Sequence, residues 1–308
     1  MTKTTTSQQS IDMLAEPAPS QLTPVKTRMA TVASEIMFDE PDTINFQHSI
    51  LCQVGLPRKR VEGDYFERRS GNAILSVQAG KYYDGKNMIQ QPVPYGPKAR
   101  LALGYIHSYA KFSNTPIIPV GDSASEFLSL IGLNSADGRT MKLVKQQMMA
   151  LSACRFMLGY LDSKGMTHTI NTQPVKHFQL WAHGESQQGS WPEQIELSLD
   201  YFQDLQKHAV PYDPRAFVAL AHSALAQDIY LLFCYRLYCL GPKGVKVTWE
   251  QWREQFGQEY TGKRALQDFK DTFIPAIKSV LQVYPQARVE YVVGGLMLKR
   301  SHPPVILK

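Results

Sequence analysis

Apolar side chains recur every three or four residues between Leu266 and Tyr284, which is the period of an amphipathic helix. The helix predicted before it has Thr248 three residues ahead of Gln251, the spacing of a capping box in which each side chain satisfies the other's backbone amide. A turn containing Gly262 separates the two helices. The pattern predicts a short capped helix, a tight turn and a longer amphipathic helix.

Further elements flank this helical pair. A long apolar helix is predicted at 218–240, a strand at 245–248, and a hairpin at 287–300 that turns at Gly294-Gly295. The order is therefore helix, strand, capped helix, turn, second helix, hairpin. A winged helix-turn-helix has this order, and in that fold the helix after the turn enters the major groove of DNA while the hairpin contacts the backbone beside it.

The first half of the chain repeats the order. A helix that opens at Pro97 precedes a strand at 116–120, and a second helix begins with Ser123 three residues before Glu126, again the spacing of a capping box. Another amphipathic helix follows at 139–154. Three strands then close this half, at 155–161, 166–172 and 176–182.

The two halves also share the spacing of two residue types, counted from the capping side chain (Ser123 or Thr248). An aromatic residue stands four positions later, Phe127 or Trp252, and a glycine stands nine positions later, Gly132 or Gly257. Two unrelated α+β modules that share a helical hairpin by chance would not need these matched offsets. We therefore predict an α+β fold of two tandem winged-helix domains.

The predicted boundaries follow composition. Residues 1–25 are rich in Thr, Ser, Gln and Pro and predict a disordered tail. The polar, glycine-containing segment 183–193 predicts a linker. We place an N-terminal winged-helix domain at 26–186, with DNA-backbone contacts, and a C-terminal domain at 187–308 that reads the major groove.

The charge of the chain permits an anionic partner. The 308 residues are 44% hydrophobic and carry a net charge of +6, and this length and composition suit two folded domains. Between Gly262 and Lys308, eight Lys and Arg stand against three acidic residues, so that +5 of the +6 lies there. Such an asymmetry permits nucleic acid as a partner without requiring it.

Cysteine usage and hydropathy bear on location. None of the four cysteines (Cys52, Cys154, Cys234 and Cys239) forms a CxxC pair, so we expect buried, reduced thiols rather than a zinc site or a disulfide. The N-terminus has no apolar signal segment, and no apolar run is long enough for a membrane span. We expect a cytoplasmic protein without membrane contact.

The polar face of the last long helix supplies the main candidate site. Arg264 and Gln267 lie near its N-terminal end, where reading helices contact bases, and these side chains pair with guanine and adenine respectively. Asp271 either accepts from cytosine or orients Arg264 or Lys278. An ordinary solvated face is the competing interpretation. The predicted contacts of this helix are Lys263, Arg264, Gln267, Lys270, Asp271 and Lys278.

Two observations weaken parts of this prediction. Asp268 and Asp271 would repel phosphates, and Pro275 removes an amide and is expected to kink the helix. Arg264 and Gln267 therefore rank above Lys278 as contacts. Backbone contacts are predicted from the C-terminal wing, by Lys299, Arg300 and His302, and from the N-terminal domain, by Lys98, Arg100, Arg139, Lys142 and Lys145.

Catalysis is not expected. Nicking initiators hold a metal with two histidines separated by one residue, and none of the eight histidines has another two positions away. The segment GPKGVKVT does not have the spacing of a phosphate-binding loop, and no acidic pair is placed for magnesium. We predict no enzyme activity, no metal and no cofactor, against the alternative of a rolling-circle nicking enzyme or a primase.

Six segments resemble the plasmid-encoded RepA replication initiator family, from about residue 46 to the end. LPRKR, PYGPKARL and QFGQEY are the more specific pieces. The segments are HSILCQVGLPRKR, FERRSGNAILSVQAG, QPVPYGPKARLAL, HAVPYDPRAFVALAHSALAQDIY, VTWEQWREQFGQEY and VLQVYPQARVEYVVGGLMLKRSHPP.

The resemblance implies a plasmid replication initiator that binds double-stranded origin DNA at repeated sequences (iterons), melts the adjacent duplex and recruits the host's replicative helicase and initiator protein. It further implies two winged-helix domains, of which the N-terminal one carries the dimer contacts. Monomers would bind the iterons, in equilibrium with homodimers that repress the protein's own gene and so take part in plasmid copy control. A transcriptional repressor on the same fold is the alternative, and local sequence does not separate the two.

Overall fold

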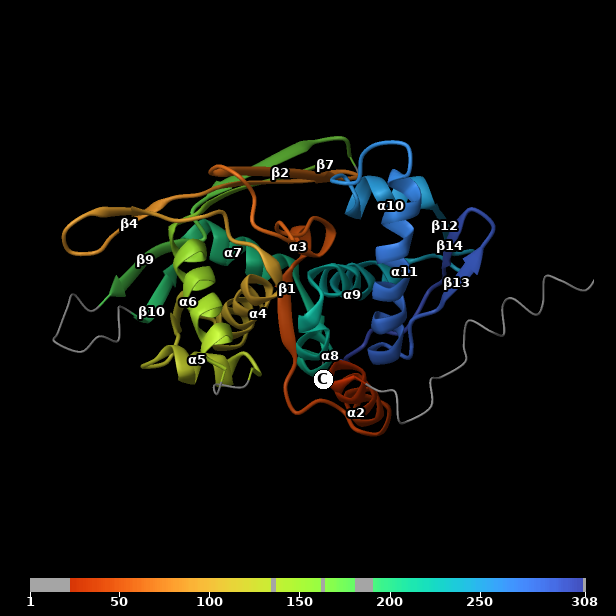
Figure 1. Cartoon of the computed structure of the whole chain (residues 1–308), viewed down its shortest axis with the longest axis horizontal. Coiled ribbons are helices and arrows are strands. Elements are labelled where there is room, and N and C mark those ends of the chain that lie inside the picture. The colour runs from red at the N-terminus through yellow and green to blue at the C-terminus, as the bar shows by residue number, and fades with distance from the viewer. Residues whose placement is uncertain (1–22, 134–136, 162–163, 181–190, 307–308) are drawn as a thin grey trace, which may run out of the picture.

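The computed structural model describes residues 23–133, 137–161, 164–180 and 191–306 (Figure 1). Helices and strands share one continuous hydrophobic core that runs through both halves of the chain. The predicted α+β class is therefore confirmed. In the described residues, no helix combines the length and apolar character that crossing a membrane requires.

The first half begins with a helix, forms two hairpins, and then enters the predicted order of helix, strand and two helices. Its elements are α2 (Pro24–Phe38), β1 (Asn45–His48), α3 (Ser49–Gln53), β2 (Tyr65–Ser70), β3 (Ala73–Gln78), β4 (Lys81–Tyr83), β5 (Met88–Gln90), α4 (Gly96–Ser113), β6 (Ile117–Pro119), α5 (Ala124–Leu130), α6 (Gly138–Ala153), β7 (Arg155–Leu161), β8 (Thr167–Thr172), β9 (Val175–Leu180) and β10 (Pro192–Leu197).

The second half starts with a connecting helix and strand and then follows the same order. Its elements are α7 (Leu199–His208), β11 (Ala209–Tyr212), α8 (Pro214–Ala219), the 3-10 helix η3 (Leu220–His222), α9 (Ala224–Arg236), the 3-10 helix η4 (Leu237–Cys239), β12 (Val245–Thr248), α10 (Trp249–Phe256), α11 (Ala265–Val283), β13 (Val289–Val292) and β14 (Gly295–Leu298).

The two halves contain three-stranded sheets of the same order. In the second half the sheet runs β12-β14-β13, and in the first half it runs β6-β10-β9, with all neighbours antiparallel. In each sheet the strand before the helical pair lies against the last strand of the hairpin after it. The first half differs by an insertion, because β7 and β8 leave this pattern and join β2 and β3 in a four-stranded sheet.

Several contacts interlock the halves. Strand β1 pairs with β11 across the sequence midpoint, α4 packs on α9, and α2 packs on α8 and α11. Helices α6 and α11 therefore lie toward opposite ends of the molecule, with α4 and α9 between them (Figure 1). The packing holds the two helices that follow the tight turns in one body.

The structure covers only parts of the predicted tail and linker. The tail 1–25 lies outside the described residues up to residue 22, but helix α2 already begins at Pro24, with its first turn capped by Thr23. Most of the linker 183–193 also lies outside them, whereas Trp191 is buried and donates its indole N–H to the carbonyls of Val120 and Gly121. Strands β9 and β10 pair across the 186/187 limit, and the domain limits stay a prediction.

Three local predictions need correction. The single helix at 218–240 is broken at Ser223, whose extended backbone and side chain cap α9. The turn of the last hairpin consists of Val293 and Gly294, with φ of 81° at Gly294, while Gly295 already belongs to β14. Cys239 is exposed, whereas Cys52, Cys154 and Cys234 are buried free thiols as expected.

The capping predictions were largely correct. Thr248 and Gln251 form the full reciprocal box at the start of α10. Ser123 accepts from the amide of Glu126 at the start of α5, but the Glu126 carboxylate accepts from the amide of Asp122 instead of that of Ser123. The first box is therefore only half formed.

Candidate nucleic-acid interface

Helix α11 presents one buried and one exposed face, as its sequence predicts. Five of the periodic apolar side chains between Leu266 and Tyr284 form a fully buried stripe, with Phe269, Phe273, Ile277, Val280 and Tyr284 all at 0% exposure. The helix is preceded by Gly262 at a φ of 89° and runs through Pro275 to Val283. The tight turn and the buried stripe fix which face of α11 points away from the protein.

The exposed face carries the predicted reading residues at its N-terminal end. Arg264 stands at the N-cap position without a capping hydrogen bond from its side chain, is 77% exposed, and has its Nε 3.7 Å from Oδ1 of Asp268. The Nε2 of Gln267 lies 2.6 Å from Oδ1 of Asp271. A carboxylate only accepts hydrogen bonds, so the amide nitrogen of Gln267 must face Asp271. Asp271 thus orients Gln267, a partner that the sequence did not indicate.

The other predicted residues of this helix differ in accessibility. Lys263 and Lys278 are exposed, at the turn before α11 and in its C-terminal half. Lys270 is only half-buried and its ammonium lies 5.7 Å from the ring centroid of Trp249, within cation–π range. The side chain of Lys270 therefore packs against the protein surface. Among Lys263, Lys270 and Lys278, Lys263 is the best placed to contact a phosphate near Arg264.

The last hairpin and the residues after it carry partly neutralised cations. Lys299 Nζ is 2.5 Å from Oε1 of Glu290, and the guanidinium carbon of Arg300 is 6.0 Å from the ring centroid of Tyr238. His302 is exposed, and its carbonyl accepts from the hydroxyl of Tyr284. Arg300 and His302 are accessible, while Lys299 must exchange an internal carboxylate for a phosphate.

Among the DNA contacts predicted in the N-terminal half, the exposed ones lie on the first turns of α6. Arg139 and Lys142 are exposed and Lys145 is half-buried, with its pKa lowered by burial. From Gln147 to Ala153 the helix is buried on all sides. Any ligand therefore meets α6 at its N-terminal end, near the Asp137 side chain that caps the helix.

Arg100 is not available to DNA, which corrects the prediction. Its side chain is buried and donates from Nε and Nη2 to the two carboxylate oxygens of Asp228, at 2.6 and 2.7 Å. It also donates to the carbonyls of Leu56, Pro57 and Gly96. Lys98, two residues earlier, is half-buried, and its pKa is lowered first by burial and then by the positive charge of Arg28.

Two arginines of the family-like segments, Arg58 and Arg68, contact the second half of the chain. Arg58 donates to the carbonyl of Phe256 and pairs with the Glu259 carboxylate, and Arg68 lies 3.6 Å from the same carboxylate. LPRKR and QFGQEY thus join the two halves through Arg58 and Glu259. The sequence showed these residues only as conspicuous motifs, because no local pattern indicates which distant acid an arginine will contact.

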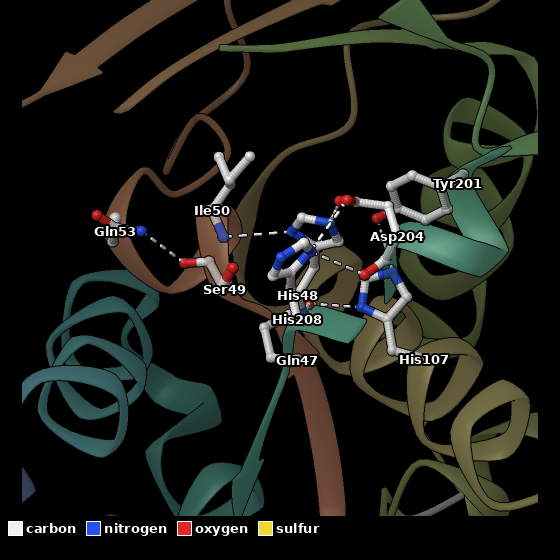
Figure 2. A network of polar contacts seen from close by, with 9 residues as sticks. All are labelled: Gln47, His48, Ser49, Ile50, Gln53, His107, Tyr201, Asp204 and His208. Carbon is white, nitrogen blue, oxygen red and sulfur yellow. Dashed lines mark hydrogen bonds and ion pairs between the residues drawn. The ribbon is translucent and has the colours of Figure 1, made fainter. Parts of the chain in front are cut away.

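A second polar network stands beside the connection between the halves (Figure 2). His48 Nδ1 accepts from the amide of Ile50, so its Nε2–H donates to Asp204 Oδ2 at 2.6 Å, while His208 Nδ1 lies 3.0 Å from the other oxygen of Asp204. Asp204 and His208 belong to α7, and His48 ends the strand that pairs with β11. The network fixes α7 against the first half.

The deeper part of this network contains a buried neutral histidine. His107 Nδ1 lies 2.5 Å from Oε1 of Gln47, and its Nε2 accepts from the hydroxyl of Tyr201 at 2.9 Å (Figure 2). Burial, followed by the charge of His48, lowers the pKa of His107 to about 3. The hydrogen bonds of His107 join α4 to β1 and α7, and we assign this cluster to packing of α4 against α7.

Comparisons with known proteins agree with the motifs. The family model described as plasmid encoded RepA protein matches residues 93–251, which is half of the chain and ends before α11. A crystal structure of domains 2 and 3 of RctB, as selenomethionine derivatives, superposes with a TM-score of 0.51 at 10% identity and covers 82% of this chain and 99% of that chain. This likeness concerns the fold alone.

A second crystal structure of RctB domains 2 and 3 gives a TM-score of 0.45 at 12% identity, covering 79% of this chain and 85% of that chain. A comparison with curated protein sequences found no match.

Proposed function

The chain belongs to the plasmid-encoded RepA replication initiator family, and from that premise we propose that it binds repeated origin sequences through two winged-helix domains. The first would comprise α4, β6, α5, α6, β9 and β10, and the second α9 to β14. The matching strand orders of the two three-stranded sheets support this interpretation. The insertion of β7 and β8 accounts for the extra strands that the first half carries.

One observation carries the proposal: the exposed N-terminal face of α11 presents Arg264 and Gln267 while the opposite face of the helix is fully buried. A helix held in this way can enter a major groove without losing core packing. An exposed guanidinium has the donor geometry to bind guanine O6 and N7. Asp268 at 3.7 Å is too distant to compete strongly for it.

The Gln267 amide is arranged to read adenine. With one N–H directed at Asp271, the other N–H and Oε1 remain free. Adenine offers N7 as an acceptor and its N6 amino group as a donor, which matches that pair of groups. Asp271 would then act as a positioning residue, since a carboxylate engaged with Gln267 is less available to accept from cytosine.

Phosphate contacts would supply most of the affinity. Lys263 lies next to Arg264 in the turn before α11, while Arg300 and His302 follow the last hairpin near the C-terminal end of α11. Arg139 and Lys142 offer a second cationic end on α6. Each neutralised phosphate releases counterions, so a protein that uses both ends should show a steep dependence of affinity on salt. We propose that binding by α11 specifies sequence and that α6 adds backbone contacts.

The remaining steps follow from family membership. We propose that binding promotes origin opening and recruits the host replicative helicase and host initiator protein in the cytoplasm, and that monomers and homodimers differ in their DNA target. We propose that the protein performs these steps without enzyme activity. Incubation of supercoiled origin plasmid with Mg²⁺ or Mn²⁺ tests the last point, because a nicked product would refute it.

The deciding experiment measures DNA binding by fluorescence anisotropy with a duplex from the region flanking the protein's own gene and with a random duplex. Arg264→Ala should cost roughly 1–3 kcal/mol on the specific duplex and relax the preference at one base pair. Gln282→Ala, which is also exposed on α11 but near its C-terminal end, is the matched control and should leave binding unchanged. Equal loss on both duplexes would reduce Arg264 to a phosphate contact.

A further inference from the structure

A cleft of about 750 Å³ lies between the two halves, away from the residues assigned to DNA. One wall is the turn between β2 and β3, at 69–72, and the other is formed by β12 and α10. Gln258 Nε2 donates to the carbonyl of Arg69 at 2.8 Å, and Gln255 Nε2 donates to the carbonyl of Gln53 at 3.2 Å. These hydrogen bonds hold the walls together, so the cleft is part of the folded junction.

The C-terminal wall of the cleft is the edge of a strand. Three consecutive residues, Val245, Lys246 and Val247, line the cleft. Side chains alternate along a strand, so three successive residues can face one space only through the strand edge. Strand β12 pairs with β14 on its other side, and within the described part of the chain no further strand pairs with it. The edge therefore offers backbone donors and acceptors to the cleft.

The cleft is also cationic. Arg69, Arg236 and Lys246 line it, and Glu254 is the one acid among the lining residues. In the described residues none of the three cations forms a hydrogen bond or an ion pair through its side chain, whereas Arg58 and Arg100 at the same junction are both paired. Burial lowers the pKa of the half-buried Arg236 guanidinium. A partly desolvated cation without a counter-charge is an unfavourable arrangement that an anionic ligand would relieve.

Two simpler interpretations account for only part of these features. A lysine on an edge strand is a common device against unwanted strand pairing, but it explains neither Arg69 nor Arg236. A nucleic-acid backbone would satisfy the cations, yet it has no regular row of N–H donors for the carbonyls of β12. An extended peptide supplies both those donors and matching acceptors, and it can carry acidic side chains to the three cations.

We propose that this cleft binds an acidic peptide segment of a protein partner in extended form, as an additional strand on β12. Lys246 then selects by charge, because it disfavours basic or self-pairing strands and favours an acidic one. The proposal does not rest on the assignment of α11 to DNA, since the two surfaces share no residue. It predicts that protein and DNA bind at separate places.

The test uses the full chain and the peptide Gly-Glu-Val-Glu-Val-Glu-Gly-amide, labelled with fluorescein on its N-terminal amine, and measures binding by fluorescence anisotropy. We expect saturable binding that weakens with salt and falls at least tenfold in Arg69→Gln/Lys246→Gln and in Arg236→Gln. The same peptide with alternate backbone nitrogens methylated keeps its charge but loses donors, and its binding should be lost. The lysine-for-glutamate peptide should not bind.

Three outcomes would overturn the proposal: no binding of the acidic peptide, equal binding of the methylated peptide, or displacement of the peptide by random duplex DNA. Origin-duplex affinity should be unchanged in Arg69→Gln/Lys246→Gln, since neither side chain lies among the DNA candidates. Circular dichroism melts confirm that each variant is folded, and Lys243→Gln, an exposed lysine in the turn before β12, is the matched control.

Discussion

Arg100 on α4 and Asp228 on α9 form a bidentate ion pair, with Nε–Oδ1 and Nη2–Oδ2 distances of 2.6 and 2.7 Å. Both side chains are buried, and they stand in the leading helices of the two repeated units. Gly55 lies directly against this pair, because a Cβ at that position would meet Oδ1 of Asp228 at 2.5 Å. The PYGPKARL motif therefore marks the junction of the halves.

Removing one member of this pair should destabilise the protein strongly. Arg100→Ala leaves the Asp228 carboxylate buried without its hydrogen-bonded partner, and breaking a buried pair in this way typically costs about 3–5 kcal/mol in free energy of unfolding. Urea denaturation measures the change, and Arg139→Ala, an exposed arginine on α6, should alter it by less than about 0.5 kcal/mol. The double change Arg100→Met/Asp228→Leu should recover part of the loss, and no recovery would contradict the assignment of the cost to the unpaired charge.

Asp271→Ala should alter base discrimination without reducing overall affinity. The change frees the Gln267 amide to rotate, so the preference for adenine at one position should fall as it does in Gln267→Ala, and the double variant should lose no more than either single variant. Loss of a negative charge near phosphates should raise affinity for random duplex slightly. Binding to duplexes with each base pair at that position measures the effect.

Asp268→Ala serves as the control for Asp271→Ala. It removes a neighbouring exposed carboxylate that lies 3.7 Å from Arg264, whereas the hydrogen bond of Gln267 goes to Asp271. It should raise affinity for random duplex in the same way but leave the adenine preference intact. Equal loss of preference in both variants would mean that the carboxylates act through charge alone.

The wing should contribute to the salt dependence of binding. Lys299→Ala and Arg300→Ala should each lower the slope of log K against log salt by about 1 on any duplex, if each side chain contacts one phosphate. Glu290→Gln removes the carboxylate 2.5 Å from Lys299 and should increase affinity for random duplex. An unchanged slope in both alanine variants would remove the hairpin from the interface.

The buried His107 should make stability depend on pH. Its folded-state pKa is lowered to about 3, while the unfolded chain binds the proton with an ordinary histidine pKa of about 6.5. The unfolded state therefore holds more protons between these values, so stability is full above about pH 6.5 and falls as pH drops, by up to about 1.4 kcal/mol per pH unit. Urea denaturation at pH 7 and pH 5 measures this loss.

His107→Gln supplies the comparison for that experiment. The amide keeps a donor toward Gln47 or an acceptor toward Tyr201 but does not titrate, so the variant should lose less stability than the wild type between pH 7 and pH 5. Exposed His302 provides the control, because His302→Gln should leave the pH dependence unchanged. A wild type and a His107 variant with the same pH dependence would contradict a buried neutral His107.

The sequence predicted what depends on local chemistry. Capping by Thr248, the tight turn at Gly262 and the buried stripe of α11 each arise from contacts among residues close in the chain, and the structure contains all three. Periodicity likewise separated the buried face of α11 from the face that carries Arg264 and Gln267. The local misses were small: the cap at Ser223 within an apolar run, the hairpin turn displaced by one residue to Val293-Gly294, and the Glu126 carboxylate that accepts from the amide of Asp122.

The tertiary structure decided which charged side chains are buried in ion pairs and which remain in solvent. By sequence Arg100 and Arg139 are equivalent cations near helix starts, yet Arg100 is enclosed by Asp228 and three backbone carbonyls while Arg139 remains in solvent. Strand pairings such as β1 with β11 have the same origin, since partners far apart in the chain meet only after the core forms. Local pattern sets the face of an element, but only the packed chain determines which faces meet.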